Sequence, residues 1–93
     1  MFLYVIGSND IQKIGYSKDV SSRLRRLQTG NPVDLVLHHV VEVPEDRARI
    51  IEQHLHKELS YLRVRGEWFK MTPEQAKLQV EHAVIRWVDD VTI

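Results

Sequence analysis

The sequence predicts an α+β domain in which a small three-stranded antiparallel sheet is flanked by three helices. Two short apolar runs lie on either side of a turn at the start of the chain, and a Val- and Leu-rich run follows at residues 33–43. The remaining long segments have the apolar spacing of helices. The chain has 93 residues, enough for one modest core, so we expect residues 1–93 to form a single domain.

Turn residues set the ends of the predicted strands. Residues 7–10, Gly-Ser-Asn-Asp, separate the apolar run 2–6 from a second strand at 11–16, so these strands are expected to form an antiparallel hairpin. The third strand is the run at 33–43. Residues 60–71, between the last two helices, are predicted to be a basic connection followed by a short extended piece.

Capping residues and apolar spacing define the three helices. The first begins at a cap, Ser17 or Asp19, and runs to about Gln28. The second lies within residues 44–62, and the third begins with a capping box and a proline at residues 72–75. The predicted buried face of the third helix comprises Ala76, Val80, Ala83, Val84, Trp87 and Val91.

Composition excludes several classes of protein. The hydrophobic fraction of 43% and the charged fraction of 28% are those of an ordinary soluble domain, and without Cys there is no disulfide or thiolate metal site. A net charge of zero argues against a general nucleic-acid coating protein, but residues 11–30 hold five Lys and Arg against one acid, which indicates a basic cleft. The apolar run at the N-terminus is too short for a signal peptide or membrane span, so we expect a cytoplasmic protein.

Glu52 is the most informative single residue because it lies among the apolar positions of the second helix. Those positions are Ala48, Ile51, Leu55, Leu59 and Leu62. A carboxylate that leaves water without a partner is costly. Glu52 therefore requires a cation, a hydrogen-bonded partner or a metal, or a place at the lip of a cleft. One interpretation is a structural ion pair with Arg23 or Lys13.

Four motifs, in order and on the expected elements, make the chain resemble a GIY-YIG nuclease domain. The motifs are Leu3-Tyr4-Val5, Lys13-Ile14-Gly15, Arg23 on the first helix and Ile50-Ile51-Glu52 on the second. The chain is most similar to the short, often phage-encoded branch in which Lys-Ile-Gly replaces Tyr-Ile-Gly. Residues 28–32 and 66–69 also look like that branch. The resemblance implies hydrolysis of a DNA phosphodiester with one divalent metal, Mg²⁺ or Mn²⁺.

The resemblance also implies roles for four residues. Tyr4 would act as general base or orient the attacking water, and Arg23 would bind the phosphate and stabilise its developing charge. Glu52 would hold the metal, since carboxylate oxygen suits Mg²⁺ or Mn²⁺. Lys13 stands where the family has tyrosine, and it would assist at the phosphate or lower the pKa of Tyr4.

Further substrate contacts are predicted around these residues: Gly15, Lys18, Arg26, Arg63, Arg65 and His56. A glycine within a strand permits close approach of a ligand, and the basic side chains suit the phosphate backbone. His56 lies on the flank of the Glu52 stripe as an extra base or phosphate ligand. Trp68 and Phe69 are predicted to be core or lid aromatics, with stacking on an unpaired base as the alternative.

The expected partner is single- or double-stranded DNA, bound by a monomer or a homodimer with no membrane association. Weak sequence specificity is expected, because the sequence contains no separate DNA-reading domain. One alternative is a binding module that holds DNA or RNA in the same cleft without cleavage. Another is a protein-interaction domain that acts through an acidic last helix carrying Glu81, Asp89 and Asp90.

Overall fold

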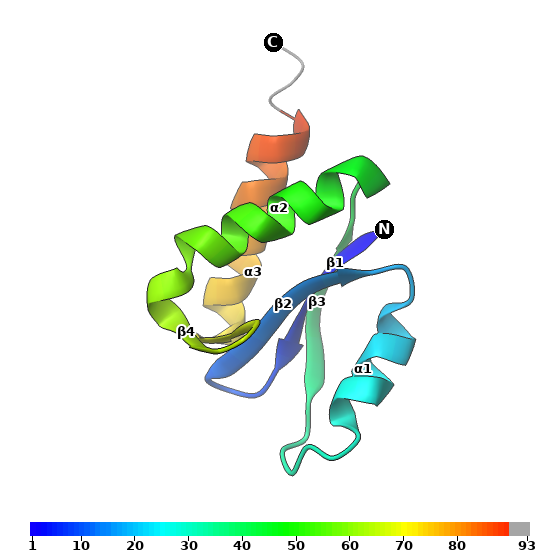
Figure 1. Cartoon of the computed structure of the whole chain (residues 1–93), viewed down its shortest axis with the longest axis vertical. Helices are drawn as coiled ribbons and strands as arrows, with labels where there is room; N and C mark the ends of the chain where they lie inside the picture. The colour runs from blue at the N-terminus through cyan, green and yellow to red at the C-terminus, as the bar shows by residue number, and fades with distance from the viewer. Residues whose placement is uncertain (90–93) are drawn as a thin grey trace.

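Two central strands with alternating side chains organise the sheet. The computed structural model describes residues 1–89. Strand β1 (Phe2–Gly7) pairs antiparallel with β2 (Ile11–Ser17) (Figure 1). This register places Tyr4 opposite Gly15. On its other side β1 pairs antiparallel with β3 (Val36–Glu42). The predicted hairpin of the first two strands is therefore confirmed.

The sheet has five strands in the order β3-β1-β2-β5-β4, so the predicted three-stranded sheet is wrong. The two additional strands, β4 (Arg63–Arg65) and β5 (Trp68–Lys70), form a hairpin within the segment that was expected to be a connection and an extended piece. Gly66 turns the chain between them with a φ of 53°. Three residues are too few to show an alternating pattern, and β5 joins the sheet by pairing with a strand more than 50 residues earlier.

Three helices complete the fold, as predicted: α1 (Val20–Gln28), α2 (Glu45–Glu58) and α3 (Pro73–Val84). The Asp19 carboxylate caps α1 by accepting a hydrogen bond from the Ser22 N–H at 3.0 Å. Thr72 forms the predicted capping box of α3. None of the helices within residues 1–89 has the length and apolar character needed to cross a membrane.

The ends of two predicted elements differ from the expectation. Helix α2 stops at Glu58, and Leu62 belongs to a following 3₁₀ turn, Ser60–Leu62. Helix α3 continues as a π-helical turn, Ile85–Asp89, while Val91 and Asp90 lie outside the described residues.

The third strand begins at Val36 rather than at residue 33 because the Gln28 side chain holds the preceding loop. The Gln28 amide nitrogen donates to the carbonyl oxygens of Asn31 at 3.3 Å and Val33 at 2.9 Å. The Gln28 amide oxygen accepts from the Leu35 N–H at 2.8 Å. Residues 31–35 are therefore fixed against the end of α1 instead of joining the ladder.

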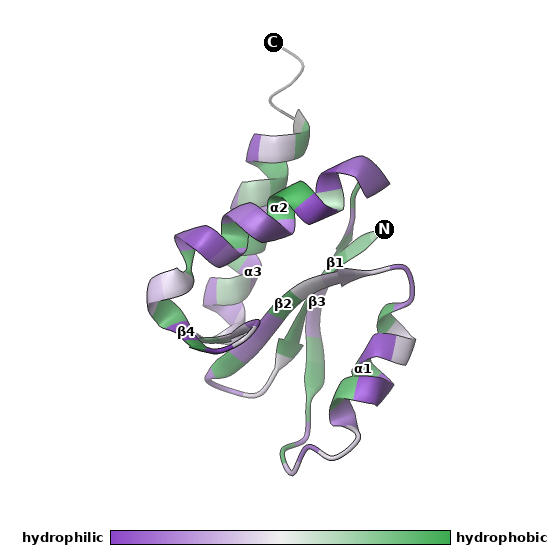
Figure 2. Ribbon diagram, in the orientation of Figure 1, coloured by the Kyte–Doolittle hydropathy of each residue, from purple (hydrophilic) through white to green (hydrophobic). Residues whose placement is uncertain are grey.

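Apolar side chains cluster on both faces of the sheet. Alternation along β1 sends Leu3 and Val5 to the face covered by α2 and α3, and Tyr4 and Ile6 to the face covered by α1. The first cluster is the larger, and it includes the buried α2 residues Ala48, Ile51, Leu55 and Leu59. In the second cluster Val20, Leu24 and Leu27 of α1 pack on the sheet. Figure 2 shows the mixed hydrophobic and hydrophilic character of α1 and α2, as expected for helices with one buried stripe.

Candidate functional site

Helix α2 lies beside a stretch of β2 that β5 does not cover. The β5 register ends at the pair Lys13–Trp68, so the following β2 residue, Ile14, has no partner in β5. The His56 Nε2 lies 2.7 Å from the Ile14 carbonyl oxygen. Because a carbonyl oxygen only accepts, Nε2 must donate, which leaves Nδ1 with a free lone pair in the neutral imidazole. This hydrogen bond holds the α2 face that carries His56 against β2. Glu52 lies on the same face, one turn earlier.

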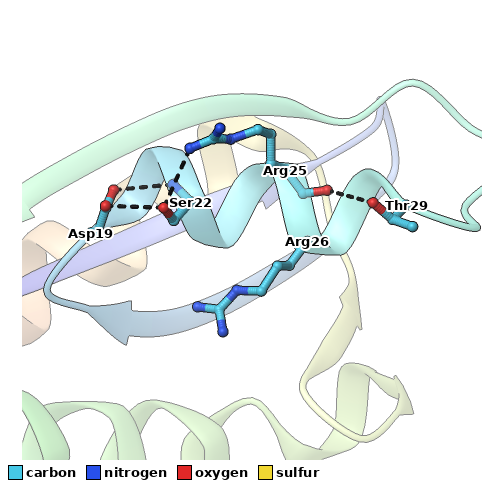
Figure 3. A pocket seen from close by; sticks show the side chains of 5 residues that line it. All are labelled: Asp19, Ser22, Arg25, Arg26 and Thr29. Atoms are coloured by element: carbon cyan, nitrogen blue, oxygen red, sulfur yellow. Dashed lines mark hydrogen bonds between the residues drawn. The ribbon is translucent and has the colours of Figure 1, made fainter.

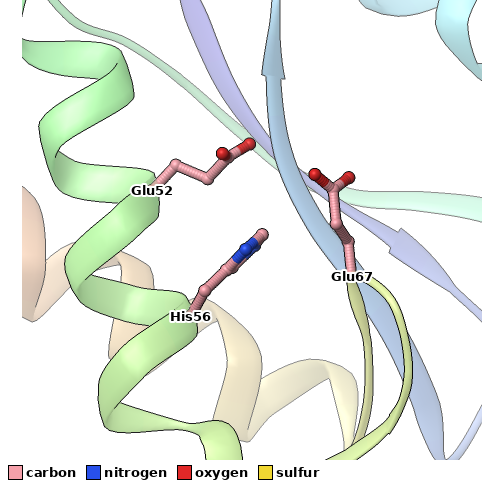
Figure 4. Close-up of side chains that lie close together, drawn as sticks. All are labelled: Glu52, His56 and Glu67. Carbon is pink, nitrogen blue, oxygen red and sulfur yellow. The ribbon is translucent and has the colours of Figure 1, made fainter.

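Glu52, His56 and Glu67 form a cluster of three groups capable of binding metal. One ligand atom from each lies within 4.8 Å of the others, and all three residues are partly buried. Figure 4 shows the two carboxyl groups directed toward the same space, Glu52 from α2 and Glu67 from the β4–β5 turn, with the imidazole beside them. Segments far apart in the sequence thus meet at one point beside β2.

The positive charges near the Glu52 carboxyl group are too weak to compensate for its burial. Burial and, to a smaller extent, the nearby Glu67 carboxylate raise the pKa of Glu52 to about 7, because the charges of Lys13 and Arg23 offset these effects only in part. Within residues 1–89 no cationic side chain forms an ion pair with Glu52. The interpretation of Glu52 as a structural ion-pair partner of Arg23 or Lys13 is therefore wrong.

Lys13 pairs with Glu67. Its Nζ lies 2.8 Å from the Glu67 Oε1, with side-chain exposures of 12% for Lys13 and 41% for Glu67. Burial alone would raise the pKa of Glu67, but the hydrogen bond and charge of Lys13 outweigh it, so the pKa lies below its ordinary value. The two carboxyl groups of the cluster therefore differ in protonation, because one has a close cation and the other does not.

Tyr4 and Arg23 lie next to this cluster and contact each other. The Arg23 Nη1 donates to the Tyr4 hydroxyl at 3.2 Å, and Tyr4 is fully buried. Gly15 makes room for the ring, because a Cβ there would lie 2.5 Å from the Tyr4 hydroxyl oxygen. Burial raises the pKa of Tyr4 and the Arg23 charge lowers it only in part, so the phenol is protonated near neutral pH.

The remaining predicted contact residues are more dispersed. Lys18 is exposed and lies 3.6 Å from Glu45, and Arg26 is exposed on α1. Figure 3 shows Arg25 and Arg26 leaving opposite sides of α1. They line a hollow of about 580 Å³, and no residue of the cluster is among its lining residues. Arg63 donates to the His56 carbonyl oxygen at 3.1 Å, which ties the hairpin to α2. Arg65 lines a separate groove beside Trp68.

The structure thus brings together six of the predicted residues: Tyr4, Lys13, Gly15, Arg23, Glu52 and His56. Glu67 is the residue of the cluster that sequence reasoning missed. Its position after Gly66, in a segment similar to the phage-type branch, was the available signal. This pattern could not place Glu67 in the structure, because the hairpin that brings Glu67 to β2 was not predicted.

The fold and the cluster define an α+β domain in which carboxylates and an imidazole lie near partly buried Lys and Arg side chains. Residues 1–89 match the T5orf172 domain, and the chain belongs to this family. Family membership is suggestive of a nucleic-acid-related function. Neither a curated protein nor a solved structure matches the chain.

Proposed function

We propose that this chain is a metal-dependent endonuclease that hydrolyses phosphodiester bonds in DNA on a GIY-YIG-type domain. The observation that carries the proposal is the Glu52 carboxyl group, whose pKa is raised to about 7 beside a second carboxylate and an imidazole. A cation would relieve this arrangement. Lys13 and Arg23 on the neighbouring β2 and α1 suit an anion, so the site offers complementary places for a divalent metal and a phosphate.

The donor set fits a hard divalent ion. Glu52 would hold it, and Glu67 and the His56 imidazole, whose Nδ1 keeps a free lone pair, would contribute from the same cluster. Carboxylate oxygens suit Mg²⁺ or Mn²⁺, while an imidazole nitrogen broadens the choice toward later metals. When bound, such an ion stabilises negative charge on the leaving oxygen of a phosphodiester.

The cationic side chains would hold the substrate. Arg23 uses one N–H on the Tyr4 hydroxyl, and its fork geometry provides further donors for a phosphate oxygen. Lys13 forms an ion pair with Glu67, which is also a member of the cluster. Its ammonium would be free for the phosphate once Glu67 turns toward a cation.

Tyr4 would orient the attacking water. Its raised pKa keeps the phenol protonated, so its hydroxyl can hold the water while Arg23 fixes the direction of the hydroxyl. Gly15 keeps the tyrosine ring in place beneath α1. This assignment gives Tyr4, Arg23 and Lys13 separate tasks beside the metal ligands.

The experiment is cleavage of labelled single- and double-stranded DNA with Mg²⁺, with Mn²⁺ and with chelator. Glu52→Gln should lower the cleavage rate at least about a thousandfold without unfolding the protein, since it removes the charge that holds the metal. Glu58→Gln is the matched control, because Glu58 lies on the same helix and pairs with Arg86 at 3.3 Å on the surface. Full activity of Glu52→Gln would rule the assignment out.

A second candidate is a nucleic-acid-binding module without cleavage. The Lys13–Glu67 ion pair favours this candidate, because Lys13 already neutralises one carboxylate of the cluster and takes the place of a metal. Such a module would bind DNA or RNA with strong salt dependence. A folded wild-type chain that shifts DNA but cleaves it with none of the metals would establish this candidate in place of the nuclease.

A further inference from the structure

A groove lies next to the cluster, on the side of the β4–β5 hairpin. Its volume is about 490 Å³. Its lining residues, which define the Trp68 groove, are Ser8, Ile11, Asn31, Val33, Leu35, Val64, Arg65 and Trp68. One wall is the loop 31–35, the other is the hairpin, and the residues of the first hairpin lie between them.

We propose that the Trp68 groove receives an unpaired nucleobase of the substrate, so that the strand to be cleaved is single-stranded next to the scissile phosphate. The inference rests on the proposed function for the position of the phosphate. It adds the substrate class, and it identifies Trp68 and the loop 31–35 as the elements that select it.

The walls of the groove are preformed. The three hydrogen bonds of the Gln28 side chain hold the loop 31–35 against α1. The opposite wall is fixed by the pairing of Trp68 with Lys13 across β2 and β5. A preformed groove loses little conformational entropy on binding, which favours capture of a flexible strand.

The lining has the chemistry of a base-binding site. Trp68, Ile11 and Leu35 supply aromatic and aliphatic surface for the face of a base, and Ser8 and Asn31 supply polar groups for its edge. Val33 and Val64 are exposed at 48% and 56%, which leaves apolar surface in water until an occupant covers it. Of the eight described lining residues none is acidic and Arg65 is basic, so the groove suits a polyanion.

The groove is separate from the proposed phosphate site but lies beside it. Lys13 Nζ lies 5.7 Å from the centroid of the Trp68 ring, and Glu67 directly precedes Trp68 in the chain. A phosphate held by Lys13 and Arg23 therefore places a neighbouring nucleotide at Trp68. A base stacked and paired within a duplex cannot present its face to this groove, so the occupant must be unpaired.

The first test is binding of labelled oligonucleotides to the full chain in chelator, where no cleavage is required. Trp68→Leu should weaken single-stranded DNA binding roughly tenfold and leave duplex binding within about twofold. Trp68→Phe should restore most of the loss, because a phenyl ring still offers a face. Trp87→Leu is the matched control, since Trp87 stacks on His54 at 4.0 Å and does not line the groove.

The second test uses the wild-type chain and therefore does not depend on folding of a variant. A fluorescent 2-aminopurine is placed at successive positions of a single-stranded oligonucleotide anchored by a duplex at one end. We expect quenching at one or two adjacent positions and none when the complementary strand is added. Uniform quenching, no quenching, or an equal effect of Trp68→Leu on both kinds of DNA would overturn the proposal. Failure of cleavage alone would not, because both tests measure binding.

Discussion

The two faces of the sheet use alternate residues of the same strands for different purposes. Toward α2 and α3, Leu3 and Val5 join a large apolar cluster. Toward α1, Tyr4 is just as deeply buried, but it contacts the guanidinium of Arg23 and borders charged side chains. Burial on the first face releases water from apolar surface, which stabilises the fold, whereas burial on the second raises the energy of charged groups.

Helix α2 contributes to an apolar and a polar environment within one turn. Leu55 belongs to the apolar cluster, whereas Glu52, three residues earlier, belongs to the cluster with His56 and Glu67. The border between the two environments therefore runs along a single helix. We infer that the first face holds the structure firmly enough for the second to retain an ionisable group whose charged form is disfavoured.

Substitution in the apolar cluster should have the largest effect on stability. Leu55 is 2% exposed, and Leu55→Ala should reduce the free energy of unfolding by about 2–5 kcal/mol by leaving a cavity. Denaturant titration measures this loss. Cleavage per folded molecule should change little, and a selective loss of cleavage beyond the folded fraction would show that the two faces are coupled.

The ionisation of Glu52 should make stability fall as the pH rises. Below pH 4.5, its ordinary pKa, Glu52 is protonated in both the folded and the unfolded chain. Between this pH and about 7 the unfolded chain loses the proton while the folded chain retains it, so the fold loses up to about 3 kcal/mol and nothing further above pH 7. The lowered pKa of Glu67 acts in the opposite direction, so the quantity to measure is the difference between wild type and Glu52→Gln.

Wild type and Glu52→Gln also distinguish the loss of stability caused by the Glu52 charge from the contribution of Glu52 to metal binding. Without metal, Glu52→Gln should be more stable than wild type at pH 8 and nearly equal to it at pH 5. Added Mn²⁺ should raise the melting temperature of the wild type more than that of the variant. Equal melting curves across the pH range would contradict the raised pKa.

Much of the fold followed from local sequence. The caps at Asp19 and Thr72, the turn after β1 and the apolar stripe of α2 are short-range signals, and each was found where it was predicted. The β4–β5 hairpin was missed because its strands are three residues long and depend on pairing with β2. Local periodicity carries no information about such a partner.

The site was predictable to the same extent. Glu52 stood out because a carboxylate interrupted an apolar stripe, and Tyr4, Lys13, Gly15 and Arg23 followed from the family resemblance. Glu67 could not be placed, because a glutamate in a polar segment is ordinary until the hairpin brings it to α2. The pairing of Lys13 with Glu67, instead of Glu52, likewise depends on that hairpin.

A smaller effect is expected where the backbone of β2 supports the polar face. Gly15→Ala would place a methyl group 2.5 Å from the Tyr4 hydroxyl oxygen, so the ring must shift at a cost of about 1–3 kcal/mol. Cleavage should fall as well, since Tyr4 and Arg23 move together. In a Tyr4→Leu background the same substitution should cost less. A double-mutant cycle measures this coupling, and strict additivity would show that Gly15 acts elsewhere.

The smallest effect is expected at Lys18, which contrasts with Lys13 on the same strand–helix unit. Lys18 and Glu45 lie 3.6 Å apart with exposures of 76% and 71%, so Lys18→Ala should change stability by less than about 0.5 kcal/mol. Its predicted contribution to DNA binding would be a single phosphate contact. Affinity for single- and double-stranded DNA should therefore fall equally, and the slope of log affinity against log salt should decrease by about one. An unchanged salt slope would place Lys18 outside the interface and confine phosphate binding to the partly buried Lys13 and Arg23.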